Sequence, residues 1–138
     1  MNIYTVKWGD KYSASHVIQI YESCLEHLTE DFTFYCLTEN GEGLPEDINV
    51  LSFPENNKLI KWWNKMYLFD PMIVKQEGEK MFFDLDTIIQ KNIDVIYDWE
   101  TEDSLSFVKT WWHDLESQWE NTRHIPHKYT DLNSSVLR

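Results

Sequence analysis

Residues 1–38 constrain the fold most, because a segment with helical spacing of apolar residues lies between two segments typical of strands. Residues 3–7 are β-branched in part and lead to a Gly-Asp pair, which predicts a short strand. From Ser13 the period is helical, and either Ser13 or Ser15 is placed to accept a first-turn N–H. The apolar face of that helix consists of Val17, Tyr21, Cys24, Leu25 and Leu28. Residues 32–38 are again β-prone, so the stretch predicts a β-α-β unit and a parallel sheet with a right-handed crossover.

Later segments extend the same pattern. Residues 48–53 predict a third short strand, and residues 62–70 a short helix that Pro71 ends. Residues 81–83 are apolar without alternation, as is typical of a strand covered on both faces. Two strand candidates and one segment of ambiguous type follow, at residues 105–110, 133–137 and 111–119. We therefore predict one α/β domain, residues 1–138, with a mostly parallel sheet and helices on both faces.

Composition narrows the class of protein. The 138 residues carry 24 Asp and Glu against 12 Lys and Arg, a formal charge of −12. Affinity for nucleic-acid backbones comes from clustered cations, so no nucleic-acid partner is expected. Seven each of Trp, Tyr and Phe are too many aromatics for a disordered chain.

The chain shows neither a signal-peptide pattern nor an apolar run of roughly 20 residues, so we expect a cytoplasmic protein without a membrane span. The two cysteines, Cys24 and Cys36, are expected to be buried, unreactive thiols.

The sharpest chemical feature is the pair Asp84 and Asp86, just past the strand predicted at 81–83. In an extended chain alternate side chains share a face, so the two carboxylates could converge. Ligands of open α/β sheets bind at the carboxyl ends of the strands. Two carboxylate oxygens there suit Mg²⁺ or Mn²⁺, with phosphate oxygens and water as the remaining ligands.

Three lysines, Lys58, Lys61 and Lys65, form a local group of cations before the strand that leads to Asp84. A divalent metal with a lysine facing it can hold a diphosphate. Lys65 is the favoured phosphate contact because it lies within the predicted helix, whereas Lys58 and Lys61 could equally cover the start of that helix.

Other interpretations of the two aspartates remain open. Asp86 could cap the following turn while Asp84 is solvated. A haloacid-dehalogenase-type phosphatase carries D-x-D-x-T, but here the fifth position is Ile88 and Thr87 comes one place early. A metal-free general acid/base pair is a further alternative, although no carboxyl separation supports it.

Four segments, in order, resemble GT-A glycosyltransferases, most closely the glycogenin-like, family 8-type enzymes and their small bacterial and phage relatives. The segments are Thr5-Val6-Lys7-Trp8-Gly9-Asp10-Lys11-Tyr12, Trp63-Asn64-Lys65-Met66-Tyr67-Leu68-Phe69, Met81-Phe82-Phe83-Asp84-Leu85-Asp86-Thr87-Ile88-Ile89 with Asn92-Ile93-Asp94, and Asn133-Ser134-Ser135-Val136. The resemblance implies a Rossmann-like nucleotide-binding GT-A domain and transfer of a sugar from a UDP-sugar donor to a carbohydrate or glycan acceptor.

The resemblance also implies roles for individual residues. Asp84 and Asp86 would hold Mn²⁺ or Mg²⁺ against the donor diphosphate, with Leu85 near the ribose. Lys65 would contact the phosphates or the donor sugar. The base site would be lined by Val6, Lys7, Trp8 and Tyr12, with Tyr12 stacking on uracil. Asn133 and Ser134 would lie near the donor sugar.

The sequence departs from the family in two ways. Gly9 stands where relatives often carry a polar residue that contacts the base. The family's third metal ligand and acceptor residues follow the N-S-G-V-type strand, so a minimal or C-terminally truncated domain is expected. His124 and His127 are the late histidines that could substitute as ligands, although an H-x-x-H spacing without a second ligand pair favours ordinary loop or surface histidines.

Two other function classes remain. The domain could be a UDP- and metal-binding module with weak transfer or slow donor hydrolysis. An acidic protein that mimics nucleic acid would need only the charge of −12, and would leave Asp84, Asp86 and the lysines unexplained.

Overall fold

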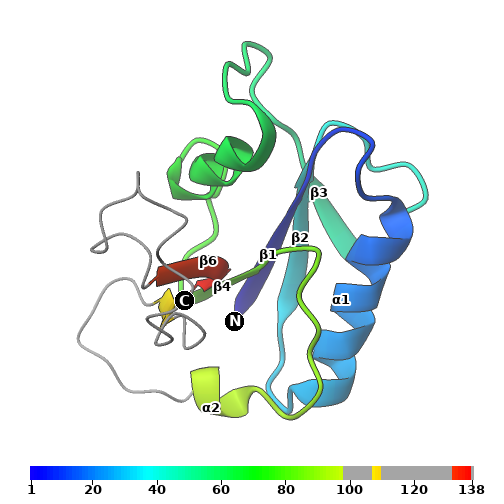
Figure 1. Cartoon of the computed structure of the whole chain (residues 1–138), viewed down its shortest axis with the longest axis vertical. Helices are drawn as coiled ribbons and strands as arrows, with labels where there is room; N and C mark the ends of the chain where they lie inside the picture. Colours follow the sequence, from blue (N-terminus) through cyan, green and yellow to red (C-terminus); the bar gives the residue numbers. More distant parts are fainter. Residues whose placement is uncertain (98–106, 110–131, 138) are drawn as a thin grey trace, which may run out of the picture.

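A mixed sheet organises the computed structural model, which describes residues 1–97, 107–109 and 132–137. In these residues the order of strands across the sheet is β3-β2-β1-β4-β6-β5 (Figure 1). The elements are β1 (Asn2–Lys7), α1 (Ala14–His27), β2 (Thr33–Thr38), β3 (Ile48–Leu51), η1 (Lys61–Phe69), β4 (Lys80–Phe83), α2 (Asp94–Tyr97), β5 (Phe107–Lys109) and β6 (Leu132–Leu137).

The predicted β-α-β unit is confirmed. β1 pairs in parallel with β2 over its whole length, from Asn2↔Thr33 to Lys7↔Thr38, and α1 connects the two strands. β1 also pairs in parallel with β4, and β2 with β3, so four adjacent strands run in one direction. The carboxyl ends of these four strands therefore lie at one edge of the sheet, where the predicted site residues follow them in the chain.

The last two strands complete the sheet in the opposite direction. The strand predicted at 133–137 is β6, which pairs antiparallel with β4 through Phe83↔Val136 and antiparallel with β5. The end of β6 pairs with the end of β4, and because the pairing is antiparallel, the beginning of β6 extends past the carboxyl end of β4. The ambiguous segment 111–119 lies outside the described residues.

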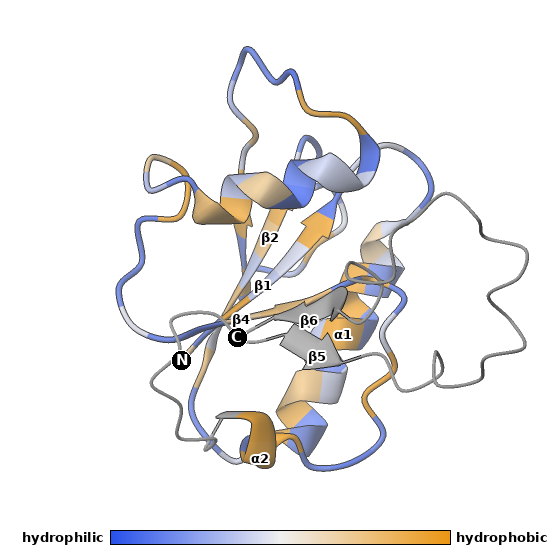
Figure 2. Ribbon diagram, turned by 60° about the vertical axis from the view of Figure 1, so that its left-hand side comes forward, coloured by the Kyte–Doolittle hydropathy of each residue, from blue (hydrophilic) through white to orange (hydrophobic). Residues whose placement is uncertain are grey.

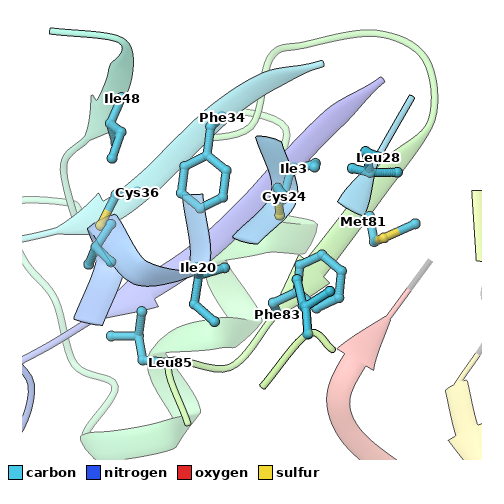
Figure 3. Close-up of a cluster of buried hydrophobic side chains, with 12 residues drawn as sticks. Ile3, Ile20, Cys24, Leu28, Phe34, Cys36, Ile48, Met81, Phe83 and Leu85 are labelled. Carbon is cyan, nitrogen blue, oxygen red and sulfur yellow. The ribbon is translucent and has the colours of Figure 1, made fainter. Parts of the chain in front are cut away.

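Alternation along the strands gives the sheet two apolar faces, and a different element covers each. Cys24 of α1 packs in one cluster with Ile3 of β1 and Phe83 of β4 (Figure 3). Tyr4 and Phe82 point to the other face, into a cluster that includes side chains from η1 and the turn after it, Leu68, Ile73 and Val74. Figure 1 shows α1 and the green helical segment on opposite sides of the strands, so the prediction of helices on both faces is confirmed.

Helix α1 begins where the sequence predicts. Ser13 precedes the first helical residue in extended conformation, and its N–H donates to Nδ1 of His16 at 3.2 Å. The helix then carries both strongly hydrophobic and strongly hydrophilic residues (Figure 2). The hydrophobic set includes the buried Val17, Ile20 and Cys24. Their burial against the sheet holds the β-α-β unit together, because removing apolar surface from water is the main favourable term in folding.

The segment predicted as a helix at 62–70 is helical, but it is a 3₁₀ helix, η1, of nine residues. In a 3₁₀ helix residues three apart lie one above the other, so η1 presents three distinct rows of side chains. Asp70 follows η1 in extended conformation, and its N–H donates to the carbonyl of Tyr67 at 3.1 Å. Pro71 comes next, as the sequence predicts for the end of this element.

Asp94 anchors a local structure at the first turn of α2. Its carboxylate accepts hydrogen bonds from the N–H and hydroxyl of Thr29, at 3.0 and 2.7 Å, and from Asn92 Nδ2 at 2.6 Å. The backbone N–H of Thr29, followed by the side chains of Asn92 and Thr29, lowers the pKa of Asp94. Its side chain therefore fastens the end of α1 to residues 92–94.

Both cysteines lie in the core as predicted, and neither forms a disulfide. Burial raises the pKa of each thiol to about 12. The reactive thiolate is therefore scarce in the folded protein at pH 8. We expect neither thiol to react with DTNB at pH 8 until the protein unfolds, when both react. A fast reaction of Cys24 or Cys36 in the native protein would contradict this packing.

No helix within the described residues is long and apolar enough to cross a bilayer.

Candidate functional site

A pocket of about 140 Å³ lies at the carboxyl ends of β1 and β4. It brings together side chains from the end of β1 and the loop after it, from η1, and from the turn after β4. The lining residues are Val6, Trp8, Lys11, Tyr12, Trp62, Lys65, Asp84, Leu85 and Asp86. Seven of them are site residues that the sequence predicts, so segments up to 80 positions apart converge as expected.

The position of Asp84 is set from the preceding strand. The last register pair between β1 and β4 is Tyr4↔Phe82. One residue further, the buried Thr5 hydroxyl donates to the carbonyl of Phe83 at 2.9 Å and continues the attachment of the two strands. Beyond Asp84, a turn follows in which the N–H of Thr87 donates to the carbonyl of Asp84 at 3.0 Å. The carboxylate is thus fixed between a paired strand and a turn.

Asp84 forms a bidentate ion pair with Lys65. Lys65 Nζ lies 2.9 and 3.0 Å from the two carboxylate oxygens, and the side chains are only 16% and 28% exposed. The same ammonium lies 5.2 Å from the centre of the Phe82 ring. Partial burial strengthens the attraction between the charges relative to a pair in water. The interpretation of Asp84 as a merely solvated residue is therefore wrong.

Asp86 is joined to the loop after β1. The Tyr12 hydroxyl donates to Asp86 Oδ2 at 3.1 Å, and Lys11 Nζ lies 4.5 Å from the centre of the Tyr12 ring. The Tyr12 side chain raises the pKa of the Lys11 ammonium, and the carboxylates of Asp86 and Asp84 act in the same direction. Two aspartates and two lysines thus line the same small pocket, which therefore holds charges of both signs.

Leu85 shows why the two aspartates lie on the same side. Its side chain is only 6% exposed and belongs to the cluster beneath α1. The apolar residue between Asp84 and Asp86 is drawn into the core, and both flanking carboxylates line the pocket.

The carboxylates fit a hard divalent cation, because carboxylate oxygens are the ligands that Mg²⁺ and Mn²⁺ prefer. Among the described residues, no group of three or more His, Cys, Asp or Glu is arranged to hold a metal. Asp84 and Asp86 would therefore supply two ligands, with the others coming from bound phosphate oxygens and water. His124 and His127 lie outside the described residues.

Lys7 does not lie in this pocket, contrary to the expectation from the sequence. It is buried, and its Nζ lies 3.4 Å from the carbonyl of Asn40, beyond the end of β2. The reason is alternation along β1: Val6 lines the pocket, so the next side chain points to the opposite face.

Asn133 and Ser134 lie near the beginning of β6, which extends past the carboxyl end of β4. This topology places both residues at the same edge of the sheet as Asp84. The environment of their side chains is outside what the structure describes.

The pocket also contains Trp62 and Lys11, and to Lys11 the sequence assigns no role. For Trp62 and Trp63 the sequence favours ordinary packing, with a sugar platform as the alternative. The 3₁₀ period separates these neighbours, because Trp62 shares a row with Lys65 and lines the pocket, whereas Trp63 does not. The signal for Trp62 was its three-residue distance from Lys65, which places the two side chains on one face of a helix.

Comparison with solved structures identifies the architecture. The chain superposes on the galactosyltransferase LgtC in complex with donor and acceptor sugar analogs, with a TM-score of 0.66 at 14% identity. It matches an active-site mutant of LgtC with a TM-score of 0.65, also at 14% identity. In both cases the alignment covers 99% of this chain and 56% of the other, so the chain spans about half the length of these proteins. No protein-family model matches the sequence, and no curated protein matches it either. The parallel β3-β2-β1-β4 sheet, its covering helices and the superposition show that this chain has the α/β fold of GT-A glycosyltransferases.

Proposed function

We propose that the protein is a metal-dependent glycosyltransferase that transfers a sugar from a UDP-sugar to a carbohydrate or glycan acceptor. The observation that carries this proposal is the convergence of Asp84, Asp86, Lys65 and Tyr12 on one pocket at the carboxyl ends of β1 and β4. The GT-A fold of the chain supports it.

The nucleotide would lie against the loop after β1. Tyr12, Trp8 and Val6 give this part of the pocket an apolar wall, and Leu85, in the turn after β4, also lines it. Stacking of a base on an aromatic ring contributes about 1–3 kcal/mol in proteins that bind single strands. Because the Tyr12 hydroxyl also bonds to Asp86, the residue that would hold the base is connected to the residue that would hold the metal.

The diphosphate would lie between the lysines and the aspartates. Asp84 and Asp86 would hold Mn²⁺ or Mg²⁺, which as a Lewis acid neutralises the charge that develops on the departing diphosphate. Lys65 is held near that position by Asp84, at 2.9 Å, and a phosphate oxygen could accept from the same ammonium. The carboxylate thus orients the lysine before the substrate arrives.

In the proposed reaction the bond between the anomeric carbon and the β-phosphate oxygen breaks, and UDP leaves with the electron pair. An acceptor hydroxyl oxygen bonds to the anomeric carbon, and its proton passes to the departing UDP or to water. The contribution of Lys65 is electrostatic, since its positive charge faces the leaving group throughout the step.

The test is release of UDP from UDP-glucose and UDP-galactose in the presence of Mn²⁺, with and without candidate saccharide acceptors. Release that rises when an acceptor is added supports transfer. Release that is slow and independent of acceptor supports the alternative, a donor-binding module with residual hydrolysis. No release and no binding of either donor contradicts both.

Trp62 and Trp63 offer a matched pair of variants for this assay. Trp62 lines the pocket and Trp63, its neighbour in the chain, is 54% exposed outside it. We expect Trp62→Ala to raise the KM for the donor roughly tenfold, because an aromatic wall is lost. Trp63→Ala should leave KM unchanged. Equal effects of the two substitutions would contradict the assigned role of Trp62.

A further inference from the structure

Exposed apolar side chains are concentrated in one stretch of the chain, residues 60–72. The described residues contain ten exposed large hydrophobic side chains, and six of them lie in this stretch: Ile60, Trp62, Trp63, Met66, Phe69 and Met72. Single exposed apolar residues are normal on protein surfaces, whereas a contiguous group usually marks a surface that binds a protein or a membrane. The stretch therefore needs a partner.

Three of these residues form one row of η1. Residues three apart lie one above the other in a 3₁₀ helix, so Trp63, Met66 and Phe69 project from the same side. They are 54%, 48% and 52% exposed, and we call them the apolar row. The neighbouring row is covered instead, because Trp62 lines the pocket that contains Asp84 and Leu68 packs on the sheet. The apolar row thus points away from the sheet.

The charge around the apolar row is opposite to that of the protein as a whole. Residues 58–75 contain four lysines and one acid, Asp70, which gives this segment a net charge of +3. Since the whole chain carries −12, the remaining residues carry −15. Lys65 faces Asp84, whereas the other three lysines, Lys58, Lys61 and Lys75, are exposed. Positive charge and apolar surface therefore occur together in one segment of an acidic protein.

The acids that follow this segment belong to a different part of the molecule. The carbonyls of Glu77 and Glu79 accept hydrogen bonds from the side chain and the N–H of Asn2, at 2.9 and 3.0 Å. Asn2 begins β1, so these glutamates lie at the amino end of that strand. The pocket that η1 borders lies at the carboxyl end of the same strand.

An anionic lipid bilayer complements this segment better than a second copy of the chain does. Lysines beside exposed Trp and Phe are typical of helices that lie in the plane of a membrane interface, and the rings sit at the level of the headgroups. A second copy packed row against row would bring two positive segments together, and each copy would carry −12. A row on the convex surface of a helix can also enter between lipids without a matching groove.

We propose that residues 58–75 dock the protein reversibly on an anionic lipid bilayer. The apolar row would enter the membrane interface, and Lys58, Lys61 and Lys75 would face the lipid phosphates. Because Trp62 lines the pocket and Trp63 belongs to the apolar row, docking would hold the pocket close to the membrane surface. The lipid contact does not involve the donor site, so turnover of soluble donors without lipid does not depend on it.

The experiment measures cosedimentation of the protein with vesicles in the absence of UDP and Mn²⁺. Vesicles of phosphatidylcholine are compared with vesicles in which about one third of the lipid is anionic phosphatidylglycerol. We expect binding to the anionic vesicles that weakens several-fold in high salt, because salt screens the attraction between the lysines and the headgroups. Binding to pure phosphatidylcholine should be several-fold weaker.

Substitutions in the segment test the two parts of the surface separately. Met66→Ser and Phe69→Ser should each lower the partition coefficient on anionic vesicles roughly tenfold, because less apolar surface leaves water. Lys75→Glu should lower it several-fold, because an attraction becomes a repulsion. These side chains are about half exposed or more, so the melting temperature should stay close to that of the wild type.

Two matched variants are the controls. Leu25→Ser changes a side chain that is 56% exposed on α1, on the other side of the sheet from η1 (Figure 1). Lys91→Glu makes the same charge change as Lys75→Glu at an exposed position after β4. Both should bind the anionic vesicles as the wild type does.

Several results would overturn the inference: no binding to the anionic vesicles, equal binding to both kinds of vesicle, or binding that Met66→Ser and Phe69→Ser leave unaltered. Analytical ultracentrifugation examines the other occupant. A wild-type dimer that Phe69→Ser dissociates, without vesicle binding, would assign the apolar row to a second copy and refute the lipid surface. Vesicle binding with the expected variant effects, but no binding of UDP, would support the lipid surface and refute the proposed donor.

Discussion

UDP together with Mn²⁺ is expected to raise the melting temperature of the protein, and Asp86→Ala is expected to abolish the metal-dependent part of the rise. A ligand present at about 100 times its Kd adds about 2.7 kcal/mol to the free energy of unfolding. For a domain of this size each kcal/mol corresponds to about 3–4 °C. The measurement is differential scanning fluorimetry with UDP alone, Mn²⁺ alone, and the two together.

Asp86→Ala also removes the acceptor of the Tyr12 hydrogen bond, so that effect needs a separate control. Tyr12→Phe keeps the aromatic ring and both carboxylates, and should retain the metal-dependent shift. Asp47→Ala makes the same change as Asp86→Ala at an exposed position before β3 and should behave as the wild type. The proposed donor site is wrong if the wild type shows no shift with UDP and either Mn²⁺ or Mg²⁺.

Lys65→Ala is expected to lower kcat with UDP-sugar donors by a factor of roughly 10², since removing one preorganised electrostatic partner of a developing charge typically costs 10²–10³. Its effect on stability should be small. The Lys65–Asp84 pair is partly exposed, and such pairs contribute up to about 1 kcal/mol. A large loss of activity with little change in melting temperature is therefore the expected combination, measured by steady-state kinetics and thermal unfolding on the same sample.

Lys58→Ala is the matched control, because Lys58 is exposed and lies outside the pocket. Lys65→Arg should recover part of the activity, since the charge remains while the geometry of the donor groups changes. Activity that Lys65→Ala leaves intact would contradict the role of Lys65 at the diphosphate. If Lys65→Ala lost activity only because the protein unfolds, its melting temperature would fall to near the assay temperature.

Much of the fold could be predicted because the spacing of apolar residues along short segments indicates which segments are strands and which are helices. The change from alternation to helical spacing between residues 3–7 and Val17–Leu28 is confirmed in β1 and α1, and the short strand before Asp84 is confirmed in β4. The pairing direction of β6 could not be predicted in this way. A strand has the same side-chain pattern whether its neighbours are parallel or antiparallel, and only the path of the connection decides its direction.

The candidate site, too, could be predicted in part from the sequence. The convergence of Asp84, Asp86 and Lys65 was predicted from their places at a strand end and in the 62–70 segment, whereas Tyr12 was predicted there only from the family resemblance. All four line one pocket. The placement of Lys7 failed because a resemblance assigns a position in the chain, whereas the alternation along β1 assigns a direction to each side chain.

By itself, the sequence determined the β-α-β unit, the strand that ends at Asp84 and the cluster of residue types suited to a metal and a diphosphate. Each of these depends on the spacing of a few residues along the chain, because spacing decides which side chains lie on the same face of a strand or helix. The tertiary structure alone decided that Asp84 pairs with Lys65, that η1 is a 3₁₀ helix, and that Trp62 lines the pocket whereas Trp63 does not. These features depend on contacts between segments far apart in the chain.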